Sequence, residues 1–218
     1  MNFVAQSFSW PFQGRWRSAW GPGLLATLLL PVAFIPLLGF AIASTRAAST
    51  DASYGPPRWQ ASVRLLSDGF WTALAIVLLT APFALLLTPL ANLLSDAHLW
   101  HVSDHMLSEV YAFLGAGFAL ALPWGLLLLL VMPHAVAQFA SSGRPADLFD
   151  FRAAVRGVRR DFTTWNLAAA AIVTAWAAAL ACIGLLCVGI VPGVFYAILV
   201  SAHASAALHD TGANPPAR

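Results

Sequence analysis

The sequence predicts an all-α, polytopic helical membrane protein, and three observations support this fold class. Hydrophobic residues make up 60% of the 218 residues, whereas charged residues make up only 9%. A soluble domain carries about 25% charged residues, so this chain has too few charges to cover a surface in water. Four long segments contain no charged residue and reach or exceed the length of a membrane-spanning helix. The polar segments between them are short, and we therefore expect a single integral membrane domain over residues 1–218.

The N-terminal part of the chain is the most ambiguous element. Residues 1–20 form a basic, tryptophan-containing interfacial segment, and the apolar residues 21–45 follow it. Pro31 and Pro36 remove backbone donors in the middle of this apolar stretch and favour a break in the helix. Broken helices at membrane depth persist only where they pack against protein. We expect a proline-broken re-entrant hairpin at 21–45, and a fifth span is the alternative.

The remaining apolar segments predict four firm spans, at 69–94, 110–140, 166–188 and 192–209. The second of these would measure about 46 Å as a straight helix against a hydrocarbon core of about 30 Å, so we expect it to tilt, kink or project from the bilayer. The last two spans arise from one charge-free run of 36 residues. This run must fold back, and the glycines and the proline of 189–193 are typical turn residues.

The distribution of arginines predicts which loops are cytoplasmic. All eleven basic residues are arginines, and eight of them lie in two segments, 46–64 and 144–160. Two predicted crossings separate these segments, so both lie on the same side, and the loop between the crossings, 95–109, has no arginine. The positive-inside rule then places the arginine-rich loops in the cytoplasm of a prokaryotic cell, at the inner membrane. The C-terminus is expected on the same side, and so is the N-terminus if residues 21–45 re-enter.

Residues 147–162 are predicted to form an amphipathic helix on the inner leaflet. Apolar residues recur there every three or four positions and form one narrow stripe: Leu148, Phe151, Val155, Val158 and Phe162. The stripe would lie among acyl chains, and the arginines beside it would meet lipid phosphates and hold the helix at the surface. This helix either anchors the orientation of the protein or offers a face for lipids or a partner. The side chains expected to face lipid or a partner are Arg152, Arg156, Arg159, Arg15, Arg17, Trp16 and Trp20.

Five histidines are candidate ligands of a metal or a haem. His98, His101 and His105 would share one face of a helix with spacings that a zinc ion accepts, although a histidine-rich polar loop is the favoured interpretation. His134 and His203 lie in different apolar spans and could be axial ligands of a haem. Hydrogen bonding of the neutral rings between helices is the favoured alternative for this pair. We therefore expect no bound cofactor, with zinc or haem as the alternatives.

The function expected from these features is that of a non-enzymatic membrane subunit or accessory protein of a larger membrane complex or transporter. The sequence has no Cys-x-x-Cys pair, phosphate-binding Gly-Lys-Ser/Thr loop or nucleophile elbow, and we single out no catalytic residue. Small residues in 167–183 would allow a partner helix to approach closely. A lipid or hydrophobic-solute transport protein is the first alternative, and a haem- or metal-binding membrane component is the second. The expected partners are the bilayer with its anionic headgroups and other membrane subunits, and not nucleic acid.

Several sequence stretches, taken in order, resemble one known family. They are GRWRSAWGPGLL, IPLLGFAIAS, YGPPRWQASVRLLSDGFW, FASSGRPADLFDFRAAVRGVRRDF and AILVSAHASA. Over about residues 8 to 208 they resemble the prokaryotic integral membrane family catalogued as domain of unknown function 4013. The chain departs from that pattern at Phe40, where Tyr is common, at Gln60, where an acid is common, and at Ser205-Ala206, which replaces a Gly-Gln pair. The resemblance implies a multi-span helical protein and assigns no activity or catalytic residue.

Overall fold

The computed structural model describes residues 3–96, 104–182 and 189–213, and the secondary structure of these residues is helical, without a strand. The predicted all-α fold class is therefore confirmed. Five of the described helical segments are long and apolar enough to cross a membrane, as expected for a multi-pass membrane protein. These segments are Leu30–Thr50, Val63–Leu85, Gly115–Ser142, Phe162–Ala181 and Ile190–His209.

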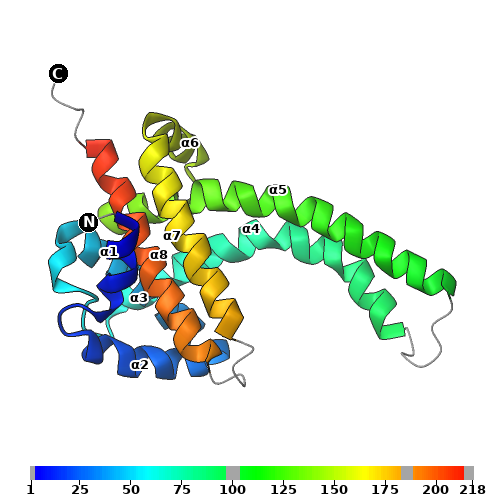
Figure 1. Ribbon diagram of the computed structural model, residues 1–218, viewed down its shortest axis with the longest axis horizontal. Helices are drawn as coiled ribbons and strands as arrows, with labels where there is room; N and C mark the ends of the chain where they lie inside the picture. The colour runs from blue at the N-terminus through cyan, green and yellow to red at the C-terminus, as the bar shows by residue number, and fades with distance from the viewer. Residues whose placement is uncertain (1–2, 97–103, 183–188, 214–218) are drawn as a thin grey trace. The chain divides into compact units, whose positions relative to one another are not determined.

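The helices follow one another with short connections (Figure 1). The α-helices are α1 (Phe3–Ser9), α2 (Trp16–Leu28), α3 (Leu30–Thr50), α4 (Val63–Asp96), α5 (Asp104–Ser142), α6 (Phe151–Arg160), α7 (Phe162–Ala181) and α8 (Ile190–Ala213). Short 3-10 helices are η1 (Trp10–Phe12), η2 (Ala52–Tyr54) and η3 (Pro145–Phe149). The chain divides into a larger unit, Met1–Ala73 with Leu130–Arg218, and a smaller unit, Leu74–Leu129.

Helix α8 forms the centre of the larger unit, where α7 and α3 are its main neighbours (Figure 1). One buried cluster combines small residues of α7 with residues of α8: Ala168, Ala171, Ala175 and Ala179 with Ala197, Val200, Ala204 and Leu208. Small side chains let the two backbones approach closely, and a Cβ atom on Gly193 would lie 3.1 Å from the Cα of Ala179. The alanines that were expected to receive a partner helix therefore pack against α8 of the same chain.

The N-terminal apolar stretch breaks at Leu29, and not at the prolines. Leu29 has φ −93° and ψ 29°, and it separates α2 from α3. Pro31 lies in the first turn of α3, where a backbone N–H would have no acceptor within the helix, so the proline costs no helical hydrogen bond. Pro36 lies inside α3, which nevertheless continues to Thr50. Helix α3 thus has the length that a fifth span requires, whereas α2, with 13 residues, measures about 20 Å.

The smaller unit consists of parts of α4 and α5 joined by one hydrogen bond and one ring contact among the described side chains. The indole N–H of Trp124 donates to the carbonyl of Leu79 at 3.0 Å. The ring centroids of Phe83 and Trp124 lie 5.5 Å apart. Half of the large apolar side chains described here are exposed, for example Leu85 at 74% and Leu122 at 65%, and the others are partly buried. Such a surface fits hydrocarbon much better than water.

Helices α3 and α4 cross at two buried glycines of the larger unit. A Cβ atom on Gly39 would meet the carbonyl oxygen of Leu65, and a Cβ atom on Gly69 would meet the carbonyl oxygen of Ile35. These neighbours are backbone atoms, which cannot rotate away as a side chain could. The crossing therefore requires glycine at both positions.

We predict that Gly39→Ala and Gly69→Ala each destabilise the protein by about 1–3 kcal/mol, because the new methyl group forces two backbones apart. The measurement is the thermal unfolding midpoint of the purified protein in one detergent. Gly21→Ala is the matched control, because nothing lies within 4 Å of its Cβ position. Unchanged midpoints for both crossing variants would contradict the packing described.

Candidate functional site

Aspartate caps begin both α6 and α7. Asp150 Oδ1 accepts a hydrogen bond from the backbone N–H of Ala153 at 2.9 Å, at the start of α6. Asp161 Oδ1 accepts from the N–H of Thr164 at 3.0 Å, and Asp161 Oδ2 accepts from the Thr164 hydroxyl at 2.6 Å. Hydrogen bonds from the side chain and the backbone of Thr164 lower the pKa of the Asp161 carboxyl. The single helix predicted at 147–162 is therefore divided between η3, α6 and the start of α7, because each capped position begins a new helix.

The residues buried around α6 differ from the predicted lipid-facing stripe. Leu148 and Val158 are buried, but they are buried together with Ala154, whereas Phe151 is 38% exposed and Phe162 is 58% exposed. Helix α6 contacts α7 and α8, so its buried residues pack inside the protein. The expectation that Leu148 and Val158 lie among acyl chains was therefore wrong. Periodicity identifies an apolar face, but it does not identify what covers that face.

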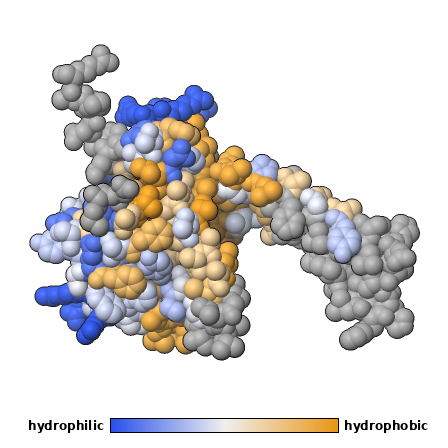
Figure 2. All heavy atoms as spheres, in the orientation of Figure 1, coloured by the Kyte–Doolittle hydropathy of each residue, from blue (hydrophilic) through white to orange (hydrophobic). Residues whose placement is uncertain are grey.

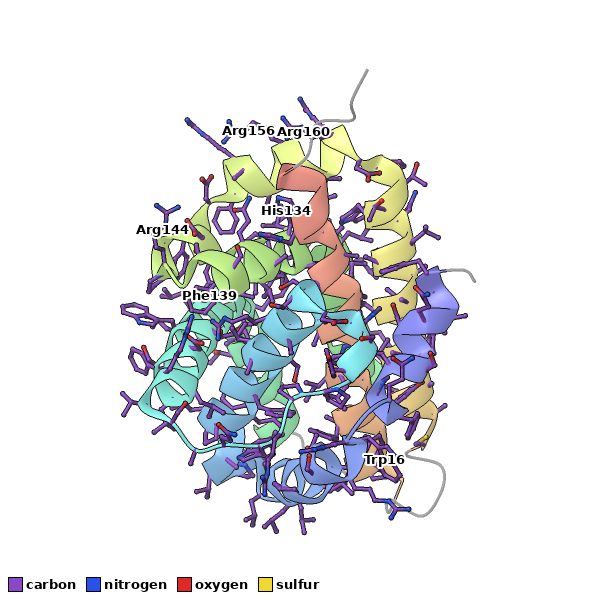
Figure 3. All side chains as sticks on the ribbon, turned by 90° about the vertical axis from the view of Figure 1, so that its left-hand side faces the viewer. Trp16, His134, Phe139, Arg144, Arg156 and Arg160 are labelled. Carbon is purple, nitrogen blue, oxygen red and sulfur yellow. The ribbon has the colours of Figure 1, made fainter. Side chains whose placement is uncertain are left out.

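The four arginines of α6 are exposed, and Figure 2 shows the strongly hydrophilic surface over this helix. Three of them, Arg156, Arg159 and Arg160, line a cavity of about 650 Å³ together with His134, Gln138, Ala153 and Gly157. We call this space the α6 cavity. In Figure 3, Arg156 and Arg160 project from α6 at one end of the larger unit, and His134 lies on the inner side of that helix. The structure thus brings one predicted haem ligand next to predicted lipid-facing arginines.

Close contact between His134 and Gly157 forms the inner wall of the α6 cavity. The imidazole ring occupies the space that a Cβ atom on Gly157 would need. His134 is 5% exposed, and its Nε2 lies 3.1 Å from the side-chain nitrogen of Gln138. An amide nitrogen can only donate, so His134 Nε2 accepts this hydrogen bond. The ring therefore has a fixed position below the arginines.

The α6 cavity carries an excess of positive charge. Its lining contains three guanidinium groups and no carboxylate. Within the described parts of the chain, none of these three arginines forms a salt bridge. A guanidinium group presents a planar set of donors that matches two phosphate oxygens at once. The arrangement can therefore bind a phosphate or another oxyanion.

A second groove adjoins the α6 cavity and shares two of its arginines. This groove has a volume of about 620 Å³ and is lined by Phe151, Arg152, Val155, Arg156 and Arg159. It combines the larger apolar side chains of Phe151 and Val155 with guanidinium groups. Five arginines were predicted to face lipid or a partner, and the three of them that lie in α6 all line this groove: Arg152, Arg156 and Arg159.

The other haem candidate, His203, is surrounded by the N-terminal segment. Its Nδ1 lies 3.0 Å from the hydroxyl oxygen of Ser7. Its ring centroid lies 6.0 Å from that of Phe3 and 5.3 Å from that of Trp10. His134 instead contacts Gln138 of α5 and Gly157 of α6. The haem interpretation requires both rings to face one space, and it stays a prediction.

The predicted zinc ligands lie largely outside the described residues. This applies to His98 and His101 entirely and to the side chain of His105. In the described part of the chain, no group of three or more His, Cys, Asp or Glu residues is placed to hold a metal ion. The zinc prediction is therefore not tested by the structure.

The aromatic residues of the basic N-terminal segment pack against each other. The indole N–H of Trp20 donates to the carbonyl of Pro11 at 2.9 Å, and the ring of Trp20 stacks on Phe12 at 5.2 Å. The guanidinium carbon of Arg17 lies 5.4 Å from the centre of the Trp16 ring. Arg15 takes no part in this cluster and lines a separate cavity with Arg58.

Sequence reasoning missed four residues that line the α6 cavity: Gln138, Ala153, Gly157 and Arg160. The i, i+4 spacing of Arg156 and Arg160 places them on one helix face, and it could have been noticed. No sequence signal pairs Gly157 with His134, because that contact joins two different helices.

One comparison with known proteins finds a family for this chain. A family model described as "Protein of unknown function (DUF4013)" matches residues 23–200. This match confirms the family suggested by the sequence motifs. Neither a curated protein nor a solved structure matches the chain.

We predict that Gly157→Leu destabilises the protein, because the new side chain must displace the His134 ring. The double variant Gly157→Leu/His134→Ala should recover part of the loss, since the smaller residue releases the required space. The thermal midpoints of both single variants and of the double variant form a cycle, with an expected coupling of about 1 kcal/mol or more. Additive effects in this cycle would contradict the His134–Gly157 contact.

Proposed function

The chain belongs to the DUF4013 family, and from its own geometry we propose that it is a non-enzymatic, lipid-binding membrane protein that holds the phosphate of an anionic headgroup in the α6 cavity. The observation that carries this proposal is the lining of the cavity: Arg156, Arg159 and Arg160, with no carboxylate among the lining residues. Three guanidinium groups that find no acidic partner among the described residues repel one another, and an anion bound between them replaces this repulsion with attraction. A lipid phosphate supplies such an anion.

The position of α6 in the chain supports a lipid ligand. Helix α6 lies between two segments that are long and apolar enough to cross a membrane, Gly115–Ser142 and Phe162–Ala181. Only eight residues separate Ser142 from the first residue of α6, and one residue separates α6 from Phe162. A short helix so close to two span ends lies at the depth of the headgroups.

The adjoining groove favours a lipid over a free phosphate compound. It shares Arg156 and Arg159 with the α6 cavity and adds the apolar side chains of Phe151 and Val155. A phosphate bound in the cavity would therefore have an apolar path beside it for the first part of an acyl chain. In this proposal α6 is an amphipathic helix of the inner leaflet, held in place by packing and exposing its arginines to headgroups.

In the same proposal, the arginines determine which side of the membrane each loop faces. The α6 arginines belong to the segment that the positive-inside rule assigns to the cytoplasm. The protein would then reside in the inner membrane of a prokaryotic cell, with its C-terminus in the cytoplasm. We propose that α2 and α3 re-enter as a pair and that the N-terminus therefore lies on the same side, because Gly14, before α2, is in backbone contact with Tyr54, after α3.

The test is lipid retention measured by native mass spectrometry, with the purified protein in micelles that contain equal amounts of phosphatidylglycerol and phosphatidylcholine. We expect the wild type to retain phosphatidylglycerol preferentially. Each arginine near anionic headgroups contributes about 1 kcal/mol, so Arg156→Gln/Arg159→Gln/Arg160→Gln should lower this preference roughly tenfold or more after salt screening. An unchanged preference in this triple variant would refute the proposal.

A charge-matched control separates the cavity from the overall charge. The variant Arg17→Gln/Arg64→Gln/Arg144→Gln removes the same charge at exposed positions outside the α6 cavity. It should retain phosphatidylglycerol like the wild type. Competition by inorganic phosphate and glycerol 3-phosphate distinguishes the ligand source, because a headgroup site that needs the acyl chains resists both. Equal binding of the soluble compounds would assign the cavity to a free phosphate compound.

A membrane subunit of a larger complex is the second candidate function. It is favoured by the low burial of an apolar 18-residue window of the Gly115–Ser142 span, of which 7% is buried within the chain, compared with 50% for the corresponding window in α8. The exposed surface of this part of the span is available to another membrane protein. The test is the mass of the complex purified in mild detergent, and a single chain without a stoichiometric second protein would count against it.

A further inference from the structure

A second charged cavity lies among α2, α3 and the segment that follows α3. Its volume is about 990 Å³, and its charged lining residues are Arg15, Arg46, Asp51 and Arg58. It shares no lining residue with the α6 cavity. We call it the α3 cavity.

Two glycines build one wall of the α3 cavity by a backbone crossing. Gly14 and Gly55 have φ angles of 58° and 71°, in the region where residues with a side chain are strained. A Cβ atom on Gly14 would meet the carbonyl oxygen of Tyr54, and a Cβ atom on Gly55 would meet the carbonyl oxygen of Gln13. The two segments are therefore in direct backbone contact. This contact places Arg15, which follows Gly14, in the same cavity as Arg58, which lies in the segment after Gly55.

The arginines of the α3 cavity differ in their partners. Arg46 Nη2 lies 3.0 Å from Asp68 Oδ2, and Arg46 Nε donates to the carbonyl of Ala140 at 2.7 Å. Arg46 is therefore neutralised and fixed by the protein itself. Arg15 and Arg58 are exposed, and neither forms a salt bridge with another described residue.

Asp51 adds a negative charge to this cavity that the arginines do not neutralise. Its Oδ1 accepts hydrogen bonds from the backbone N–H of Ser53 at 2.8 Å and from the Ser53 hydroxyl at 2.6 Å. These hydrogen bonds, with that of the hydroxyl as the larger cause, lower the pKa of the Asp51 carboxyl, so it is ionised at neutral pH. Asp51 forms no salt bridge with any described arginine, although Arg15 and Arg58 line the same cavity. The cavity therefore presents separated charges of opposite sign.

We propose that the α3 cavity binds a zwitterionic headgroup made of a phosphate ester and a primary ammonium group, as in phosphatidylethanolamine. Its phosphate would bind to Arg15 and Arg58, and its ammonium group to Asp51. The positive and negative groups of this cavity line the same space but do not form a salt bridge with each other. Such a cavity is complementary to a ligand that carries a negative and a positive group at separate positions. A primary ammonium group donates hydrogen bonds to a carboxylate, whereas the trimethylammonium group of choline has none to donate. Asp51 thus selects ethanolamine over choline, and this inference does not depend on the α6 cavity.

The test measures retention of phosphatidylethanolamine against phosphatidylcholine by native mass spectrometry of the purified full-length chain in mixed micelles. We expect the wild type to prefer phosphatidylethanolamine. Asp51→Asn should lower this preference about tenfold, because a hydrogen bond between two charged groups is lost. Asparagine still accepts the hydrogen bond from Ser53, so the local turn is preserved. Arg15→Gln/Arg58→Gln should weaken the retention of both lipids.

Controls make each outcome decisive. Arg17→Gln removes a neighbouring exposed charge that does not line the cavity, and it should behave like the wild type. The triple glutamine variant of α6 should keep the preference for phosphatidylethanolamine, which separates this site from the proposed anionic site. Competition by O-phosphoethanolamine but not by phosphocholine would show that the headgroup alone is sufficient, and absence of competition would show that the whole lipid is required. A wild type without the preference, or a preference that persists in Asp51→Asn, overturns the proposal.

Discussion

Close approach of helix backbones to α8 is the constraint on which the larger unit depends. On one side, alanines of α7 pack against α8 with so little space that Gly193 cannot carry a side chain without meeting Ala179. On the other side, the ring of Phe195 fills the space next to Gly23 of α2. The same ring lies 6.1 Å from that of Phe40 in α3. Dispersion contacts between such closely spaced elements take the role that hydrophobic exclusion of water plays in soluble proteins.

Both cavities lie at the ends of helices that this packing holds in place. Helix α7 is fixed against α8, and a single residue, Asp161, connects α6 to α7. This short connection gives the arginines of α6 a defined position. Helix α3 is fixed against α8 as well, and Asp51 caps its end. The two cavities then differ in one chemical respect. The α6 cavity has no carboxylate in its lining, whereas the α3 cavity has Asp51. Two lipid classes that differ in headgroup charge would therefore be bound by one chain at two separate places.

Much of the fold could be predicted from the sequence, because the signals for it are local. Charge-free runs longer than a bilayer predicted the helices that are long enough to cross it, and the order of the motifs indicated the family. Local sequence signals were less reliable for features that depend on packing, such as the position of a helix break or the surface that covers an apolar stripe. Two prolines favoured a break that lies instead at Leu29, since a proline in the first turn of α3 costs no hydrogen bond. The stripe beginning at Leu148 was correctly apolar but was assigned to lipid, because periodicity does not name the covering surface.

Long-range contacts explain most of what the sequence did not reveal about the sites. Two contacts join segments that are distant in the sequence: Gly157 with His134, and Gly14 with Tyr54. Each contact is possible because the glycine has no side chain. From a single sequence, one cannot predict which neighbouring residue lies against a given glycine and excludes a side chain there. By contrast, the arginines at 152, 156 and 159 were identified because their spacing is local, and these three are the ones that the groove beside the α6 cavity brings together.

The central claim is that packing within the protein holds α6, so that its arginines form a fixed site. Leu148 and Ala154 are completely buried, and Val158 is 7% exposed. Hydrogen exchange of residues 151–160 in bilayer nanodiscs tests this claim most directly, with the wild type compared with Arg152→Glu/Arg156→Glu/Arg159→Glu. If packing holds the helix, its amide protection in the variant will equal that in the wild type, although headgroup attraction has been reversed. Loss of protection confined to this segment would contradict the claim and show that lipid headgroups hold α6 at the surface.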